Sequence, residues 1–145
     1  MIYTIDSSIW VNSCDQREEG YAASRQMIAE LESRGIAVIL PTLALVEIAG
    51  AISRSRTDAQ LGFTFAQAVA ARPNVSLVNL PKGVAQQASV LAAHHRLRGA
   101  DAVYAAVAQR MHTTLVSRDR EHLTRLIGVV VVQTPEQVLA GLATG

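Results

Sequence analysis

Five short apolar runs alternate with helical segments along this 145-residue chain, and this alternation constrains the fold more than any other feature. The runs lie at residues 2–5, 36–40, 75–80, 114–116 and 129–132. Runs of β-branched and other apolar residues predict strands, and runs without polar alternation are typical of strands that are buried on both faces. Strands that alternate with helices predict a parallel sheet between helical layers. We therefore expect an α/β fold, a three-layer α/β/α sandwich.

Residues that favour helix ends predict where several helices begin. We expect helices at about residues 20–34, 42–56, 57–71, 81–98 and 101–112, and a last one after residue 134. Thr42 is predicted to cap the second of these helices. Thr57 with Gln60 three residues later has the form of a capping box. The segment Thr134-Pro135-Glu136-Gln137 is a strong helix-start signal.

Length and composition favour one compact domain, residues 1–145. Half of the residues are hydrophobic, which suffices for a core and is too many for a disordered protein. No apolar run approaches the roughly 20 residues that a membrane span requires, and the N-terminus lacks the pattern of a signal peptide. Cys14 is the only cysteine, so no internal disulfide can form. We expect a cytoplasmic protein that does not associate with membranes.

The net charge of +1 is divided unevenly along the chain. Residues 1–71 carry five Arg against eight acids, a net charge of −3, whereas residues 72–145 carry eight cations against four acids, a net charge of +4. Twelve of the thirteen cations are Arg, the side chain best suited to bidentate phosphate contact. The basic half is compatible with a nucleic-acid surface, but an arginine-rich composition with ordinary solvated faces is the favoured explanation of the charge alone.

Four acidic residues lie outside the polar, plausibly exposed stretches that contain most of the acids. Asp6 and Asp119 follow the first and fourth predicted strands, and Asp101 begins an alanine-rich helix. Each of these three also fits a helix N-cap or an acid in a first helical turn. Glu47 lies in an otherwise uncharged helical run, where a carboxylate is costly unless a cation compensates it. Contact with the helix dipole or with solvent would also account for Glu47.

If the first and fourth strands are neighbours, these acids converge on one crevice at the carboxyl edge of the sheet. Crowded carboxylates repel one another, and a hard divalent cation removes that repulsion. Oxygen ligands suit Mg²⁺ or Mn²⁺, and neither the cysteine nor the histidines have the spacing of zinc ligands. The sequence therefore predicts an acidic Mg²⁺ site. No catalytic role is expected for the four histidines, His94, His95, His112 and His122.

Four motifs cover nearly the entire chain in a fixed order. They are Ile-Asp-Ser-Ser-Ile at 5–9, Pro-x-x-x-x-x-Glu at 41–47, Arg-Gly-Ala-Asp at 98–101 and Leu-Val-Ser-Arg-Asp at 115–119. This set resembles the PIN-domain family, and within it the small VapC-type toxin ribonucleases of bacterial toxin–antitoxin pairs. The resemblance implies an α/β/α domain with a five-stranded parallel sheet. It matches the family's acidic positions to Asp6, Glu47, Asp101 and Asp119, and its supporting hydroxyl positions to Ser7 and Ser117; Glu121 would add a fifth acid.

The resemblance also implies an activity and partners. The family cleaves RNA, is usually homodimeric, and is silenced by a cognate antitoxin that occupies the active-site groove. One or two Mg²⁺ or Mn²⁺ ions held by the carboxylates would orient and acidify a water for in-line attack on phosphorus. Phosphate contacts are expected from Arg96, Arg98, Arg118 and Arg120, for which solvated positions are an equal alternative.

Competing classes of protein fit less well. A haloacid-dehalogenase-type phosphotransferase needs a second Asp two residues after the first, where Ser8 stands. A receiver domain needs a Lys after its last strand, and Lys82 is the only Lys. Two alternatives stay open, a PIN-like domain that binds RNA or protein without cleavage and an RNA-processing nuclease outside a toxin–antitoxin pair. Metal titration with a cleavage assay separates binding from cleavage.

Overall fold

The structure, a computed structural model, describes all residues from Met1 to Gly145. Five parallel strands form one sheet in the order β3-β2-β1-β4-β5. The strands are β1 (Tyr3–Ile5), β2 (Val38–Pro41), β3 (Val75–Val78), β4 (Thr114–Val116) and β5 (Val132–Gln133). β1 pairs with β2 on one side and with β4 on the other. The first and fourth predicted strands are therefore neighbours at the centre of the sheet.

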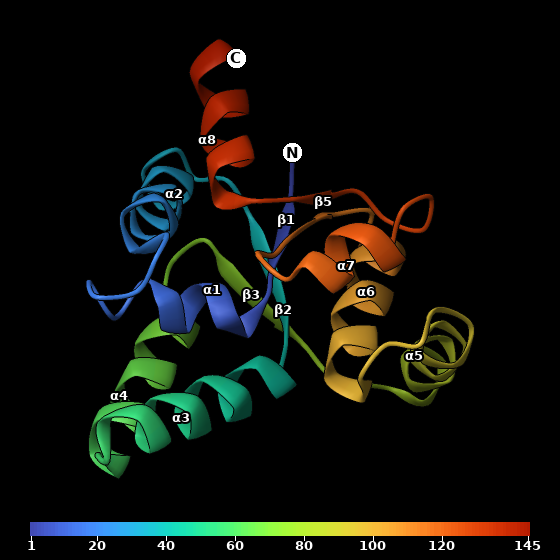
Figure 1. The fold of residues 1–145 in the computed structure, drawn as a ribbon, viewed down its shortest axis with the longest axis horizontal. Coiled ribbons are helices and arrows are strands. Elements are labelled where there is room, and N and C mark those ends of the chain that lie inside the picture. The colour runs from blue at the N-terminus through green and yellow to red at the C-terminus, as the bar shows by residue number, and fades with distance from the viewer.

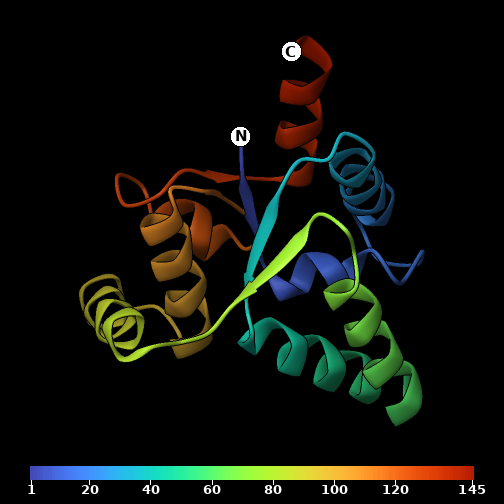
Figure 2. The same ribbon diagram turned by 180° about the vertical axis from the view of Figure 1, so that it is seen from behind.

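Eight helices connect the strands and cover both faces of the sheet. They are α1 (Ser7–Asn12), α2 (Tyr21–Ser33), α3 (Leu43–Arg56), α4 (Ala59–Ala70), α5 (Lys82–His95), α6 (Gly99–Met111), α7 (Arg120–Arg125) and α8 (Pro135–Thr144). Figures 1 and 2 show α1 to α4 on one side of the sheet and α5 to α7 on the other. α8 packs against α2. The expected α/β/α architecture is confirmed. None of the helices combines the length and the apolar character that a membrane span requires.

The central strands and α6 form the best-buried part of the molecule. Tyr3, Ile5, Leu115 and Val116 are at most 2% exposed, as expected for strands covered on both faces. Residues 102–108 of α6 are all buried, and four of them are alanines. Small side chains let α6 pack closely against β1, β2 and β4. The N-terminal turn of α6 is therefore held against the same strands that end near Asp6 and Asp119.

The capping box predicted at Thr57 and Gln60 is wrong. Thr57 ends α3 in a left-handed conformation with φ of 52°, and the next residue, Asp58, caps α4. The Asp58 carboxylate accepts a hydrogen bond of 2.9 Å from the backbone N–H of Leu61. A carboxylate competes well for this role, because it interacts with the positive end of the helix dipole as well as with the N–H groups.

The other helix and strand ends predicted from the sequence are confirmed only in part. Thr42 occupies the N-cap position of α3 but its own backbone is already helical, and its side chain makes no capping hydrogen bond. The helix predicted to reach residue 98 ends at His95, since Arg96 takes a left-handed conformation with φ of 54°. β5 begins at Val132 rather than at residue 129, because a turn occupies residues 126–130. The start predicted at Thr134 is confirmed, with Gln137 completing a capping box.

Candidate functional site

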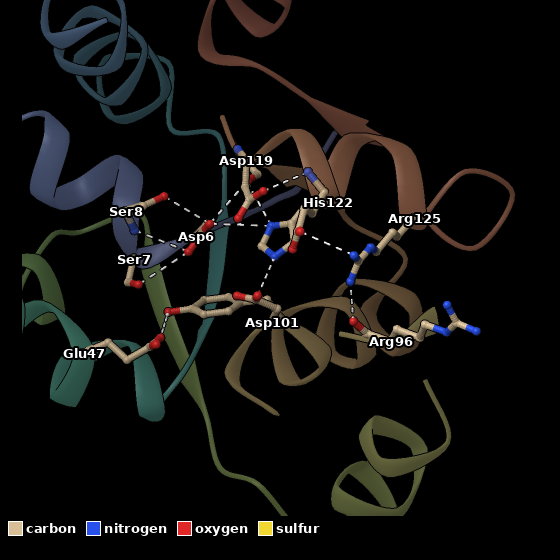
Figure 3. A network of polar contacts seen from close by, with 12 residues as sticks. Asp6, Ser7, Ser8, Glu47, Arg96, Asp101, Asp119, His122 and Arg125 are labelled. Carbon is tan, nitrogen blue, oxygen red and sulfur yellow. Dashed lines mark hydrogen bonds and ion pairs between the residues drawn. The ribbon is translucent and has the colours of Figure 1, made fainter. Parts of the chain in front are cut away.

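Three acidic side chains meet at the carboxyl edge of the two central strands (Figure 3). Asp6 directly follows β1, and Asp119 lies three residues after the end of β4. Asp101 reaches the same place from the first turn of α6. Because β1 and β4 are parallel neighbours, residues that follow them lie side by side although they are far apart in sequence.

Asp6 is the most enclosed of the acids, at 6% exposure. Its Oδ1 accepts a hydrogen bond of 3.3 Å from the backbone N–H of Ser8, so Asp6 is also the N-cap of α1. Its Oδ2 accepts from the hydroxyl groups of Ser8, at 3.1 Å, and Ser117, at 3.2 Å. The Ser7 hydroxyl lies 3.4 Å from Oδ1. Donors to both oxygens hold this carboxylate in one orientation, and capping is one of its roles rather than an alternative to the cluster.

Ser117 connects three parts of the cluster through one buried hydroxyl group. Besides donating to Asp6, its Oγ accepts a hydrogen bond of 3.1 Å from the backbone N–H of Asp119. The Nδ1 atom of His122 lies 3.0 Å from the same Oγ. Asp119 in turn caps α7, accepting a hydrogen bond of 2.8 Å from the backbone N–H of Glu121. The supporting position proposed for Ser117 is thus one where it contacts two of the acids.

His122 is a member of the cluster that the sequence did not identify. It is 1% exposed, and its Nε2 lies 3.1 Å from Asp101 Oδ2 while its Nδ1 lies 3.7 Å from Asp6 Oδ2. Burial lowers the pKa of its imidazole, but Asp101, Asp6 and Asp119 outweigh burial, so that the pKa is raised above its ordinary value. Positive charge is therefore favoured at this position. One sequence signal was available: His122 follows Asp119 by three residues, which places both on one face of a helix.

Glu47 approaches from α3 and stays apart from the other acids (Figure 3). Its Oε1 accepts a hydrogen bond of 2.8 Å from the hydroxyl of Tyr104, which lies one helical turn after Asp101 on α6. Burial raises the pKa of Glu47, the Tyr104 hydrogen bond opposes this, and the charges of Asp6 and Asp101 raise it further. Glu47 is therefore close enough to share the electrostatics of the cluster, and a buried phenol holds its carboxylate.

The raised pKa of Glu47 predicts how its replacement changes stability. An acid whose pKa is raised in the folded state stabilises that state at pH values below its ordinary pKa, and this contribution is lost as the pH rises through the folded pKa. At neutral pH a Glu47→Gln variant is therefore expected to melt at a higher temperature than the wild type. The gain is expected to disappear below the ordinary glutamate pKa of 4.5.

Thermal unfolding followed by circular dichroism at both pH values, with a chelator present, measures this difference. Glu19→Gln is the matched control, because Glu19 is exposed and removing its charge should shift the melting temperature little at either pH. An equal or lower melting temperature for Glu47→Gln at neutral pH would show that the charged Glu47 carboxylate does not destabilise the folded state.

The four arginines predicted to contact phosphate differ in their surroundings. Arg118 is engaged within the fold: its guanidinium donates to the carbonyl of Gly20 at 3.1 Å and to Glu136 Oε1 at 2.7 Å. A Cβ at residue 20 would lie 2.3 Å from the Arg118 Cζ, so the contact requires glycine there. Arg96, Arg98 and Arg120 are exposed, and Figure 3 shows Arg96 turned away from the acids.

The cluster has the donor groups that a divalent cation requires. One donor atom each from Asp101, Asp119 and His122 lie within 4.8 Å of one another. Asp6 joins this group through Ser117 and lies 3.7 Å from His122. The Nε2 of His122 is buried without a hydrogen bond, and its ion-pair contact with Asp101 at 3.1 Å is the contact that a cation bound there would replace. Carboxylates together with a ring nitrogen fit a divalent cation.

Similarity to solved structures is extensive at low sequence identity. PAE2754 from Pyrobaculum aerophilum is 19% identical with a TM-score of 0.74, covering all of this chain and 91% of that one. VapC20 from Mycobacterium tuberculosis, described as a sarcin–ricin loop cleaving toxin, is 16% identical with a TM-score of 0.67, covering 78% and 86%. A toxin–antitoxin complex from Klebsiella pneumoniae is 18% identical with a TM-score of 0.64, covering 92% and 97%.

Family models give a direct assignment, although no curated protein matches the sequence. The model of the PIN domain matches residues 3–126, from the first strand to the end of the helix that follows Asp119. This range includes Asp6, Glu47, Asp101, Asp119 and the hydroxyl groups of Ser7 and Ser117. The fold of the structural neighbours agrees with the match. The chain belongs to the PIN domain family.

Proposed function

We propose that this chain is a divalent-metal-dependent endoribonuclease and the toxin of a toxin–antitoxin pair in the cytoplasm. The observation that carries the proposal is the convergence of Asp6, Asp101 and Asp119 at the carboxyl edge of β1 and β4 in a PIN-domain chain. Carboxylates that crowd together favour bound cations, and RNA brings phosphate groups that need the same cations. VapC20, a structural neighbour described as a sarcin–ricin loop cleaving toxin, supports the choice of RNA as substrate.

Each residue has a proposed task in the reaction. Asp6, Asp101 and Asp119 would hold Mg²⁺ or Mn²⁺, with Glu47 as a further ligand or as the group that holds the water. The cation, when bound, acts as a Lewis acid that lowers the pKa of the attacking water and offsets charge on the phosphate. Ser117 and Ser7 orient Asp6 through the hydrogen bonds described above. Donation from Ser7 in α1 and from Ser117 after β4 fixes the carboxylate of Asp6 from two sides.

The proposed reaction is a hydrolysis in line with the leaving oxygen. The water oxygen attacks phosphorus, and the bond from phosphorus to the 3′ oxygen breaks. One proton of the water is taken up by a carboxylate of the site, and the 3′ oxygen leaves as a hydroxyl after it gains a proton. The products are a 5′-phosphate and a 3′-hydroxyl, so water is the only co-reactant, and the proton it gives up balances the one that the 3′ oxygen gains.

RNA would reach the acids from the exposed side of the cluster. An open groove of about 540 Å³ beside the site is lined by Ser7, Ser8, Glu47 and Arg54, with other residues of α1 and α3. Arg98, three residues before Asp101, and Arg120, directly after Asp119, are the arginines we propose for phosphate contact. Arg118 is not among them, because its guanidinium is committed to Gly20 and Glu136.

A cognate antitoxin and a second copy of the chain are the proposed protein partners. The toxin–antitoxin complex among the structural neighbours supports the first of them. Co-expression with the product of an adjacent small gene should then yield a stable complex that no longer cleaves RNA. Sedimentation of the chain without the antitoxin measures whether it is a dimer.

A cleavage assay with the purified chain tests the proposed activity. Incubation with total RNA and Mg²⁺ or Mn²⁺ is expected to give discrete fragments that carry 5′-phosphates and 3′-hydroxyls, as read by end-specific ligation. A chelator is expected to stop the reaction, and added Mn²⁺ to restore it. Binding of RNA without any fragments would favour the non-cleaving alternative. Fragments with 2′,3′-cyclic phosphates would contradict the hydrolytic mechanism.

A further inference from the structure

The hydroxyl of Ser117 determines which nitrogen of His122 carries a proton. A serine hydroxyl has one hydrogen to donate and two lone pairs to accept with. Its hydrogen points to Asp6 Oδ2, and one lone pair accepts from the backbone N–H of Asp119. The remaining lone pair faces His122 Nδ1 at 3.0 Å, so Nδ1 must be the donor. In the neutral ring, the lone pair then lies on Nε2.

The Nε2 of His122 faces the acids and lies closest to Asp101. The atom is buried and makes no hydrogen bond. Asp101 Oδ2 lies 3.1 Å away, where it forms an ion pair with the ring when the ring is protonated. A carboxylate oxygen at this distance requires a positive charge at Nε2, which either a proton or a metal ion can supply.

The spacing of these two atoms fits two ligands of a single ion. Ligands at right angles on one ion, each about 2.1 Å from it, are about 3.0 Å apart. The 3.1 Å between Nε2 and Asp101 Oδ2 agrees with this arrangement. Asp119 offers a third donor atom within 4.8 Å of the others. Donation from Nδ1 to a fixed oxygen is also the usual way in which proteins orient a ligating histidine.

We propose that His122 is a metal ligand through Nε2, which together with Asp101 and Asp119 makes a mixed nitrogen and oxygen site that prefers a first-row transition cation to Mg²⁺. This inference deepens the proposed function, because it places the ion in the same cluster. Imidazole nitrogen is a good ligand for transition ions, whereas Mg²⁺ strongly favours oxygen. Manganese is the probe of choice, since it accepts carboxylate ligands readily and is paramagnetic.

Pulsed electron paramagnetic resonance of the full chain with bound Mn²⁺ tests the ligand directly. The wild type is expected to show the hyperfine coupling of a coordinated nitrogen, and labelling of histidine alone with ¹⁵N should change that coupling to the ¹⁵N pattern. The coupling should disappear in His122→Asn and persist in His94→Asn, a control on an exposed histidine. Bound Mn²⁺ with no histidine nitrogen coupling would overturn the proposal. The isotope experiment needs no variant, so it decides even if His122→Asn fails to fold.

Relative affinity gives a second readout that a purely positioning histidine would not produce. His122→Asn is expected to weaken Mn²⁺ binding by at least roughly 10–100-fold, the effect that residues orienting a metal ligand already have. The size of this loss alone does not identify a ligand, so the loss of Mn²⁺ affinity is compared with that of Mg²⁺. Mg²⁺ affinity, measured by competition against Mn²⁺, should fall much less. Equal losses for both ions would mean that His122 only positions the carboxylates, and would overturn the ligand assignment.

The two proposals can fail separately. RNA cleavage without nitrogen coupling leaves the ribonuclease assignment intact and removes His122 from the ligands. Nitrogen coupling without RNA cleavage leaves the metal site intact and removes the ribonuclease assignment.

Discussion

Replacing Asp6 with asparagine is expected to reduce RNA cleavage by about 10³-fold or more, equivalent to about 4 kcal/mol of transition-state stabilisation. Asparagine keeps the size of the side chain and can still accept the N-cap hydrogen bond from Ser8. It removes one negative charge from the proposed metal ligands, and its amide group meets the hydroxyl donors of Ser8 and Ser117. Initial rates on a labelled RNA, with circular dichroism as a check on folding, measure the effect.

Asp58→Asn is a matched control for this experiment. Asp58 is also a helix N-cap whose side chain accepts a backbone N–H, but it lies at the start of α4. Its replacement should leave the cleavage rate within about twofold of the wild type, because asparagine caps helices as well as aspartate does. A folded Asp6→Asn protein that cleaves RNA at a near wild-type rate would remove Asp6 from the catalytic groups.

Replacing Trp10 with alanine is expected to lower the free energy of unfolding by about 3–5 kcal/mol, the usual effect of truncating a large buried aromatic side chain. Trp10 is 1% exposed, and it anchors α1, the short helix that Asp6 caps. For a chain of this size the melting temperature should fall by on the order of 10 °C. Urea denaturation followed by circular dichroism measures the change, because the variant has no tryptophan left to report fluorescence.

Trp10→Phe tests how the loss of stability depends on the volume that is removed. The indole Nε1 has no hydrogen-bond partner, so phenylalanine removes no hydrogen bond and leaves a smaller cavity. We expect a loss of about 1–2 kcal/mol for this variant. A Trp10→Ala variant that is as stable as Trp10→Phe would contradict the packing of α1 described above.

Sequence patterns predicted the sheet well because its strands are buried on both faces. The run Thr114–Val116 is typical of a strand covered on both faces, and its bounds were predicted correctly. Element ends were less certain, since adjacent residues compete for one role. Thr57 and Asp58 both favour helix starts, and only the conformation of the chain between α3 and α4 decides that Asp58 becomes the cap.

Acidic residues at strand and helix ends could be found from the sequence, because parallel topology brings such ends to one edge. His122 could not be found in the same way. Its helix, α7, has only six residues, and so short a segment has no clear apolar face to show which side is buried. Arg118 illustrates the opposite error: its sequence position beside Asp119 suggested phosphate contact, but Gly20 and Glu136, distant in sequence, take up its guanidinium.

The central pairing of β1 with β4 has a consequence for the protein during its synthesis. The pair joins Tyr3–Ile5 to Thr114–Val116, so that more than a hundred residues separate the two sides of the acidic cluster. A nascent chain that has emerged only as far as α6 contains Asp6 and Asp101 but lacks Ser117, Asp119 and His122. The cluster is therefore completed late in translation, and a truncated chain that ends before β4 would lack half of the side chains that the proposed activity requires.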